Sequence, residues 1–215
     1  MHRIRMCATA LTLTAVAAGA VACAGPVTAP GTGAAPLVAP AASATPMAEP
    51  YGDCADVPTT ELGNRPLVAA LAAVPRLAAL SAALGRLPAL AGALDAAPAL
   101  TVFAPTDAAF EALRGRLGAP EFDALMGDAE RLDGLLSYHV TEKRLDARGL
   151  VEAGKTTQLA WGDVTVADTP EMLTLASTDE GTAGVVCGNV QSANATVFLV
   201  DAVLTPATPT APPAP

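Results

Sequence analysis

The chain has 215 residues, of which 52% are hydrophobic and only 3% aromatic, so it can form one domain of ordinary size with a core of Leu, Val and Ala. Its formal net charge of −9 argues against nucleic-acid binding and heparin-type ligands, because an acidic surface repels phosphate backbones and other polyanions.

Residues 1–22 have the three parts of a secretory signal peptide. Arg3 and Arg5 form its positive start, an apolar uncharged run follows, and Ala20-Val21-Ala22 supplies small residues at a cleavage point. The apolar run is shorter than the roughly 20 residues of a transmembrane helix. Removal of this segment would leave ten basic and 21 acidic residues, which makes the mature chain still more acidic.

Cys23 follows these small residues directly, as in the bacterial lipobox, where the cysteine thiol is acylated and becomes the new N-terminus. A lipobox usually has Leu three positions earlier, where this chain has Ala20, so cleavage after Ala22 with free secretion is the alternative. Residues 23–52 are rich in Ala, Pro, Gly and Thr, a composition that forms a spacer rather than a core. A spacer beside a lipid site suits a tethered domain, so we expect an anchor on Cys23 and an extracytoplasmic location.

The four cysteines predict one disulfide. Cys7 and Cys23 lie within or directly after the signal, which leaves Cys54 and Cys187 as an even pair in an exported chain. Oxidising compartments favour a bridge between them, and it would enclose nearly the whole domain. The alternative is a cysteine nucleophile paired with His139, for which the sequence shows no third group that would orient the histidine.

Residues 67–100 are dense in Leu and Ala and predict several short helices. Pro75 and Pro88 lie near helix starts, where proline is tolerated, and Gly85 lies near a helix end. Leucines at helical spacing mark a core face: Leu77, Leu80, Leu84 and Leu87. The arginines and prolines within this stretch argue against a membrane span.

Residues 99–104 form an apolar run that predicts a buried strand ending at Pro105. Thr106 can cap the following helix, and Asp107 complements the positive end of its dipole. The inward stripe of that helix would be Phe110, Leu113 and Leu117. A further helix begins near Asp128, with an inward stripe of Leu132, Leu135 and Leu136.

Short strands are expected from Thr156 onward. Residues 158–161 and 164–166 flank Gly162-Asp163, which fits a two-residue type II′ turn with Gly first. Further apolar runs continue this half at 172–176, 184–187 and 196–204.

Helices in the first half and strands in the second indicate an α+β domain. The chain therefore divides into a signal peptide (1–22), a lipid-anchor cysteine with its linker (23–52), the domain (53–206) and a tail (207–215). The tail contains only Pro, Ala and Thr and is expected to be disordered.

Three sequence blocks occur in a specific order. The first is Thr101-Val102-Phe103-Ala104-Pro105-Thr106-Asp107-Ala108-Ala109-Phe110, and the second is Tyr138-His139. The third joins Gly188-Asn189-Val190-Gln191 to residues 196–206, which include Val200-Asp201 and Val203-Leu204. Together the blocks resemble those of the fasciclin (FAS1) domain family, with its TVFAPTDxAF segment, central Tyr-His and closing strand pair.

Two shorter segments resemble the bacterial single-domain branch of that family, which includes secreted and lipid-anchored surface antigens of actinobacteria. They are Gly52-Asp53-Cys54-Ala55 and Val185-Val186-Cys187-Gly188. The resemblance implies a Cys54–Cys187 bridge, a compact β-wedge with helices packed on one side, and adhesion or ligand binding at the cell surface.

Tyr138-His139 is where function is usually sought in this family, since the resemblance implies an adhesive role for that region. The residue pattern favours a different interpretation: His139 shares a helix face with Leu132 and Leu135, as a hydrogen-bonded core histidine does. Asp201 lies in an apolar run and is interpreted as a structural carboxylate.

We therefore expect a binding or adhesion module and not an enzyme. No metal or cofactor is expected, because His139 has no second ligand nearby in the sequence and no phosphate loop or nucleophile elbow occurs. The Asn194-Ala195-Thr196 triplet fits an N-glycosylation pattern but is interpreted as part of a strand. The partner would be a surface protein, a polysaccharide or a lipid, bound by a monomer; an envelope enzyme and a purely structural protein are the alternatives.

Overall fold

The computed structural model describes residues 49–160, 162–169, 172–177 and 181–205, all within one compact unit, Ser43–Pro215. The predicted signal peptide, Cys23, most of the linker 23–52 and the tail 207–215 lie outside the described residues. Within them the α+β prediction is confirmed, since most helices lie in the first part of the chain and five consecutive strands, β4 to β8, lie in the last part.

The first half of the described chain is mainly helical, because leucine and alanine recur between prolines and glycines that set the helix ends. The helical segments are α1 (Thr59–Leu62), α2 (Leu67–Ala72), the 3-10 helix η1 (Pro75–Leu77), α3 (Ala78–Gly85), α4 (Pro88–Ala96), α5 (Asp107–Leu117), α6 (Ala119–Gly127), α7 (Ala129–Ser137) and α8 (Ala147–Ala153). The predicted starts at Pro75 and Pro88 and the predicted end at Gly85 are confirmed. Helices α1, α6 and α8 were not predicted from the sequence.

The strands form one sheet in the order β3-β2-β8-β7-β6-β5-β4, and β1 pairs with β7. Their bounds are β1 Tyr51–Gly52, β2 Leu100–Pro105, β3 Val140–Thr141, β4 Lys155–Thr157, β5 Asp163–Asp168, β6 Leu173–Ser177, β7 Thr182–Gln191 and β8 Ala195–Val200. The β2–β8 pair is parallel, with Phe103 opposite Phe198, and the other pairs are antiparallel. The sheet therefore joins the TVFAPTDxAF-like segment directly to the closing block.

Strands β2 and β8 are buried on both faces, and their side chains alternate between two cores. Val102 and Val197 belong to a core shared with the helices α1 to α7. Phe103 and Phe198 point into a second core with residues of β5, β6 and α8, where their ring centroids are 6.1 Å apart. Continuous apolar runs in these two strands thus reflect burial on both faces.

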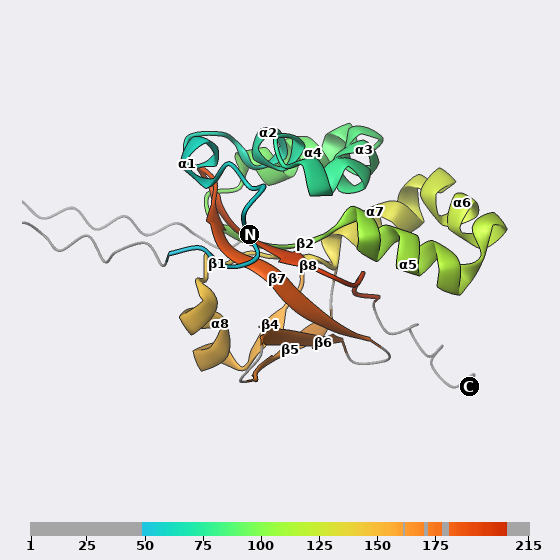
Figure 1. Ribbon diagram of the computed structural model, residues 1–215. Coiled ribbons are helices and arrows are strands. Elements are labelled where there is room, and N and C mark those ends of the chain that lie inside the picture. Colours follow the sequence, from blue (N-terminus) through green and yellow to red (C-terminus); the bar gives the residue numbers. More distant parts are fainter. Residues whose placement is uncertain (1–48, 161, 170–171, 178–180, 206–215) are drawn as a thin grey trace, which may run out of the picture. The chain divides into compact units, whose positions relative to one another are not determined.

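The helices α1 to α4 lie together over one face of β2, β7 and β8, and α5 to α7 lie beside them (Figure 1). Helix α8 lies apart from them, next to β4, and contributes Leu150 to the second core. Two helix-covered cores result, so the expectation of helices on one side holds for the first seven α-helices and not for α8.

The predicted strand at 158–161 and the two-residue turn are wrong. Strand β4 ends at Thr157, and Thr157 pairs with Asp163, so the connection runs from 158 to 162 and Asp163 already belongs to β5. Side chains favour this register: Thr157 Oγ1 donates to Asp163 Oδ1 at 2.9 Å, and Lys155 Nζ lies 2.6 Å from Asp163 Oδ2. Trp161 lies outside the described residues.

Two smaller predictions also need correction. Leu117 was expected to face inward, but it is 39% exposed, because the last turn of α5 extends beyond the core that buries Phe110 and Leu113. The final strand was expected over 196–204, but β8 ends at Val200, and Asp201 lies exposed in a bend.

Among the described residues, no single helix has the length and hydropathy of a membrane span. The pair formed by Pro75–Gly85 and Pro88–Ala96 meets the length and composition test together, but it is bent by 114°. The leucines of this helix pair are buried in the core that Val102 and Val197 share with the helices α1 to α7.

Candidate functional site

Tyr138 lies directly after α7 and fills the second core with its ring, fully buried. Its hydroxyl donates to the carbonyl of Asp163 at 3.2 Å. Gly162 has φ +111°, and a Cβ there would come within 2.8 Å of the Tyr138 ring. The ring and the β4–β5 connection therefore pack so closely that only glycine fits at position 162.

His139 is 2% exposed, and both of its ring nitrogens have backbone partners. Nδ1 donates to the carbonyl of Leu135 at 2.8 Å, and Nε2 accepts from the amide of Leu204 at 2.9 Å. This pairing fixes the neutral tautomer that is protonated at Nδ1. Burial lowers the pKa of His139 to about 4, because desolvation penalises the imidazolium. The interpretation of His139 as a hydrogen-bonded core residue is confirmed.

Cys54 and Cys187 form the predicted disulfide, with Cα atoms 5.2 Å apart across a sequence separation of 133 residues. Strand β1 precedes Cys54 and pairs with β7 in the register Gly52 opposite Cys187. Gly52 has φ +81°, and a Cβ there would meet the carbonyl oxygen of Val186. A Cβ on Gly188 would collide with the ring of Tyr51 in the same way. Because both positions are glycine, strand β1 at the start of the domain can pair closely with β7.

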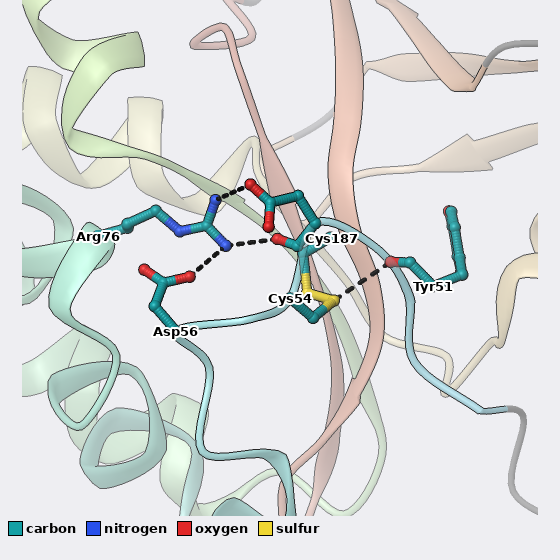
Figure 2. A network of polar contacts seen from close by, with 6 residues as sticks. Tyr51, Cys54, Asp56, Arg76 and Cys187 are labelled. Atoms are coloured by element: carbon teal, nitrogen blue, oxygen red, sulfur yellow. Dashed lines mark hydrogen bonds and ion pairs between the residues drawn. A yellow bond between two sulfur atoms is a disulfide. The ribbon is translucent and has the colours of Figure 1, made fainter.

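Arg76 holds the same segment from the helical side, as Figure 2 shows. Its guanidinium donates to the carbonyl of Asp53 at 2.6 Å and pairs with the carboxylates of Asp56 at 2.7 Å and Asp53 at 3.7 Å. This contact was not predicted, because the sequence shows Arg76 only as a charge that argues against a membrane span. We call Tyr51, Asp53, Cys54, Asp56, Arg76 and Cys187 the N-terminal clasp.

The TVFAPTDxAF-like block forms β2 and the start of α5. Thr106 Oγ1 accepts from the amide of Ala109 at 3.4 Å, which is the expected N-cap. Asp107 does more than complement its own helix, because its carboxylate accepts the amide of Ala79 at the start of α3 at 2.7 Å. Thr101, whose hydroxyl donates to the carbonyl of Lys143 and accepts from the amide of Leu145, secures the loop after β3.

Asp201 lies just after β8, and its carboxylate accepts the amide of Gly184 at 2.7 Å while its own amide donates to the Gly184 carbonyl at 3.1 Å. A side chain on Gly184 would collide with Met172. Asp201 therefore extends the β7–β8 contact beyond the strand end. The hydrogen-bond partners of Asp201 and His139 are different backbone groups, so the structure does not bring the two side chains into an acid–base pair.

Asn194 and Asn189 are polar residues of the closing block whose structural roles the sequence analysis missed. The Asn194 amide accepts from the Leu67 amide at the start of α2 and donates to the carbonyls of Leu94 and Ala97 at the end of α4. Asn189, with φ +58° at the β7 irregularity, accepts from the first amide of α8, Ala147, at 2.8 Å. The amide of Asn194 is thus used inside the fold.

Two hollows open on the described surface. The first, which we call the seam hollow, has a volume of about 380 Å³ and is lined by Thr141, Glu142, Lys143, Thr157, Gln158 and Leu159. The second, the α8 cleft, measures about 470 Å³ and lies between α8 and the ends of β5 and β6; it is lined by Tyr51, Ala147, Arg148, Val151, Glu152, Asp168, Thr169, Met172 and Leu173. Burial and the nearby carboxylate of Asp168 raise the pKa of the Tyr51 hydroxyl well above its usual range.

Over the described ranges, no three His, Cys, Asp or Glu side chains gather closely enough to hold a metal ion. Both side chains of the Tyr-His block are buried, and the sulfurs of Cys54 and Cys187 are bonded to each other. The residues singled out from the sequence therefore stabilise the fold, and the two hollows are candidate ligand sites on the described part of the surface.

The family model for the fasciclin domain matches residues 75–206, more than half of the chain. The chain belongs to the fasciclin domain family. The matched range contains the three blocks described above and both hollows apart from Tyr51.

The fasciclin-domain chain is similar to the cell surface glycolipoproteins MPB83 of Mycobacterium bovis and MPT83 of Mycobacterium tuberculosis, with 40% identity over 106 residues. That segment covers 49% of this chain and 43% of each relative. The immunogenic protein MPB70 of Mycobacterium bovis matches with the same identity over 49% of its length. The chain thus spans less than half the length of these relatives.

A solved FAS1 domain pair from the insect cell adhesion molecule fasciclin I has the same fold, with a TM-score of 0.58 at 13% identity. The likeness covers 66% of this chain and 51% of that one. It confirms the predicted fold class, a fasciclin-type wedge of strands with helices packed against it.

Proposed function

We propose that this protein is an exported cell-surface protein, tethered through a lipid on Cys23, whose fasciclin domain adheres or binds a ligand without catalysing a reaction. The observation that supports binding rather than catalysis is the burial of the Tyr138-His139 block: both nitrogens of His139 bond to backbone groups, and the residue is 2% exposed. A general acid or base must reach a proton of its substrate, which this geometry prevents.

Relatives support the location at the surface. MPB83 and MPT83 carry the description of cell surface glycolipoproteins, MPB70 that of an immunogenic protein, and the insect protein that of a cell adhesion molecule. The glycolipoproteins are described as lying at the cell surface and the insect protein as adhesive, and either role requires a stable exposed domain. The disulfide and the acidic charge suit such a domain in an oxidising environment.

The order of segments along the chain supports the proposed lipid tether. A cysteine follows the predicted signal, and a spacer of Ala, Pro, Gly and Thr leads to the N-terminal clasp. A single acyl chain binds membranes weakly, whereas the two chains of a diacylglyceryl group give lasting attachment. The clasp joins this attachment to the middle of the sheet, because β7 pairs with β1, β6 and β8.

Intact-mass analysis of the mature protein from a lipoprotein-processing bacterium tests the proposal. We expect a chain that begins at Cys23 and carries a diacylglyceryl adduct, accessible on whole cells to an impermeant amine-reactive biotin. The Cys23→Ser variant serves as the control and should appear unacylated in the medium or the membrane-free fraction. An unmodified wild-type chain that begins at Cys23 or later would show free secretion, and a chain that keeps residues 1–22 in the cytosol would refute export.

A further inference from the structure

The α8 cleft gathers apolar side chains that neither core covers. Val151 of α8 is 39% exposed, and Met172, the residue before β6, is 41% exposed; both line this cleft. The apolar surface therefore comes from two elements, a helix on one side and the start of a strand on the other. Large apolar side chains that share one hollow are typical of a surface that another group covers.

The polar groups of the cleft do not select an ion. Its charged lining residues, Arg148, Glu152 and Asp168, take part in no ion pair among the described residues, and they bring charges of both signs. The Tyr51 hydroxyl is buried, so it offers no bond to a group in the cleft. The apolar surface therefore decides what packs there.

The start of the described chain lies beside this cleft. Tyr51 of β1 is one of the lining residues, and two positions earlier the carbonyl of Glu49 accepts from Asn189 Nδ2 at 3.2 Å. Oδ1 of the same asparagine accepts the amide of Ala147, the first residue of α8, at 2.8 Å. One side chain thus joins Glu49 to the start of α8, and Figure 1 shows the first described residues on the side of the sheet where α8 lies.

The spacer residues directly before this point, 45–48, contain one large apolar side chain, that of Met47. Met47 precedes Tyr51 by four positions, so their Cα atoms are at most about 14 Å apart. Pro46 and Pro50 favour extended backbone in the residue before each of them, which reduces the entropy that the segment loses on binding. An unbranched methionine side chain also adapts to an irregular hollow.

We propose that residues 45–48 dock in the α8 cleft, with the side chain of Met47 packed against Val151 and Met172. Because Tyr51 joins the segment to the cleft, docking is intramolecular and proceeds at a high effective concentration, which a free molecule of the same chemistry does not have. The inference goes beyond the proposed function. The spacer residues nearest the domain become part of its surface, and an external ligand of the cleft has to displace Met47.

Oxidation of methionine by hydrogen peroxide, followed by mass spectrometry of peptides, tests the docking, because a covered thioether reacts slowly. The protein is the full mature chain with Cys23→Ser, which has no acyl group and no free thiol. We expect Met47 to react at least about threefold more slowly than in a free peptide of residues 45–50, since the rate follows the population of the undocked form. Equal rates in the chain and in the peptide would overturn the proposal.

A spacer variant separates docking from other causes of slow reaction. Met47→Ser should make Met172 react about twofold faster or more, because it uncovers that side chain. Val27→Ser removes an apolar side chain from the same spacer at a distant position and is the matched control, with no change expected at Met172. Partly buried Met126 should react alike in all three proteins and so reports an intact domain.

Two results with these variants would contradict docking within one chain. The first is an unchanged rate for Met172 in Met47→Ser. The second is protection of Met172 that increases with protein concentration, since it would assign the cleft to a second copy of the chain. Neither measurement depends on the acyl group, so failure here is distinct from failure of the surface tether.

Discussion

Each ring nitrogen of His139 bonds to a backbone group from a different part of the chain, Leu135 in α7 and Leu204 after β8. Tyr138 beside it fills the second core and packs against Gly162. The two residues thus connect the end of α7, the β4–β5 connection and the closing block. Their polar atoms hold the two cores together from inside, which explains why a Tyr-His pair stands at the end of an amphipathic helix.

The buried histidine makes stability depend on pH. Its pKa in the folded state is about 4, below the ordinary 6.5, so the unfolded chain takes up the proton first as the pH falls. The contribution of His139 is complete above pH 6.5 and is lost progressively down to pH 4, by about 3 kcal/mol in all.

Urea unfolding of the wild type and of His139→Gln at several pH values between 4 and 7 checks this. The variant does not protonate in this range, so the difference in unfolding free energy between the two proteins should shrink as the pH falls. The carboxylates titrate in both proteins and cancel in the difference. A difference that stays constant over the range would show that solvent already reaches the histidine in the folded state.

Asn194 offers a second test at the residue scale. Its amide connects the turn between β7 and β8 to the start of α2 and the end of α4. Asn194→Ala should lower the free energy of unfolding by about 2–3 kcal/mol, because it leaves partly buried backbone groups unpaired. The exposed Asn64→Ala is the matched control, with an expected change within about 0.5 kcal/mol. Equal effects of the two substitutions on the urea midpoint would contradict the assigned role.

At the scale of elements, helix ends are stabilised by residues from other parts of the chain. Helix α3 has no side-chain cap of its own, and Asp107 of α5 accepts the amide of Ala79 instead. In the same way Asp95 of α4 accepts the amide of Val68 in α2 at 2.9 Å. Such caps couple helix formation to tertiary packing, because free amides at a helix start need an acceptor.

We expect Asp107→Ala to reduce the thermal midpoint and to lower the unfolding free energy by about 1–2 kcal/mol, since it removes an acceptor for α3 and a carboxylate from the first turn of α5. Asp123→Ala deletes the same group at an exposed position of α6, where it caps no helix, and should be nearly neutral. Matching thermal midpoints for these two variants would exclude the cap between helices.

Most elements could be predicted because their signals are local. Prolines set the starts of η1 and α4, Asp128 caps α7, and continuous apolar runs identify β2 and β8. The register of β4 and β5 could not be predicted from the sequence, because it depends on the Thr157–Asp163 hydrogen bond and on the space that Tyr138 leaves at Gly162. The seam hollow could not be predicted either, since its two lining segments come together only in the folded chain.

At the scale of the whole molecule, one covalent bond joins the beginning of the domain to its longest strand. Cys54 and Cys187 are 133 positions apart in the sequence, and Arg76 adds ionic contacts to the same segment. This pairing could be predicted from an even number of domain cysteines in an exported chain, whereas the role of Arg76 required the folded structure. In the chain-entropy treatment, the disulfide of the clasp stabilises the fold mainly because it reduces the conformational freedom of the unfolded chain.

The Cys54→Ser, Cys187→Ser double variant should therefore lose stability by about 5 kcal/mol in the chain-entropy treatment of so long a loop. Calorimetry of the double variant against the wild type measures this loss, and Cys23→Ser is the control that leaves the clasp intact. A thermal midpoint that does not change on removal of the bridge would show that the non-covalent contacts of the clasp hold the segment alone.

The claim that the Tyr-His block is interior structure, so that any ligand meets the outer surface, can be tested at one residue. The chain has two histidines, and His2 lies in the predicted signal, so a domain prepared without residues 1–22 contains His139 alone. Its pKa can therefore be measured directly by NMR of histidine-labelled protein. We predict a single neutral resonance that begins to change only as the pH approaches about 4. Titration near 6.5 in the folded protein would contradict the account.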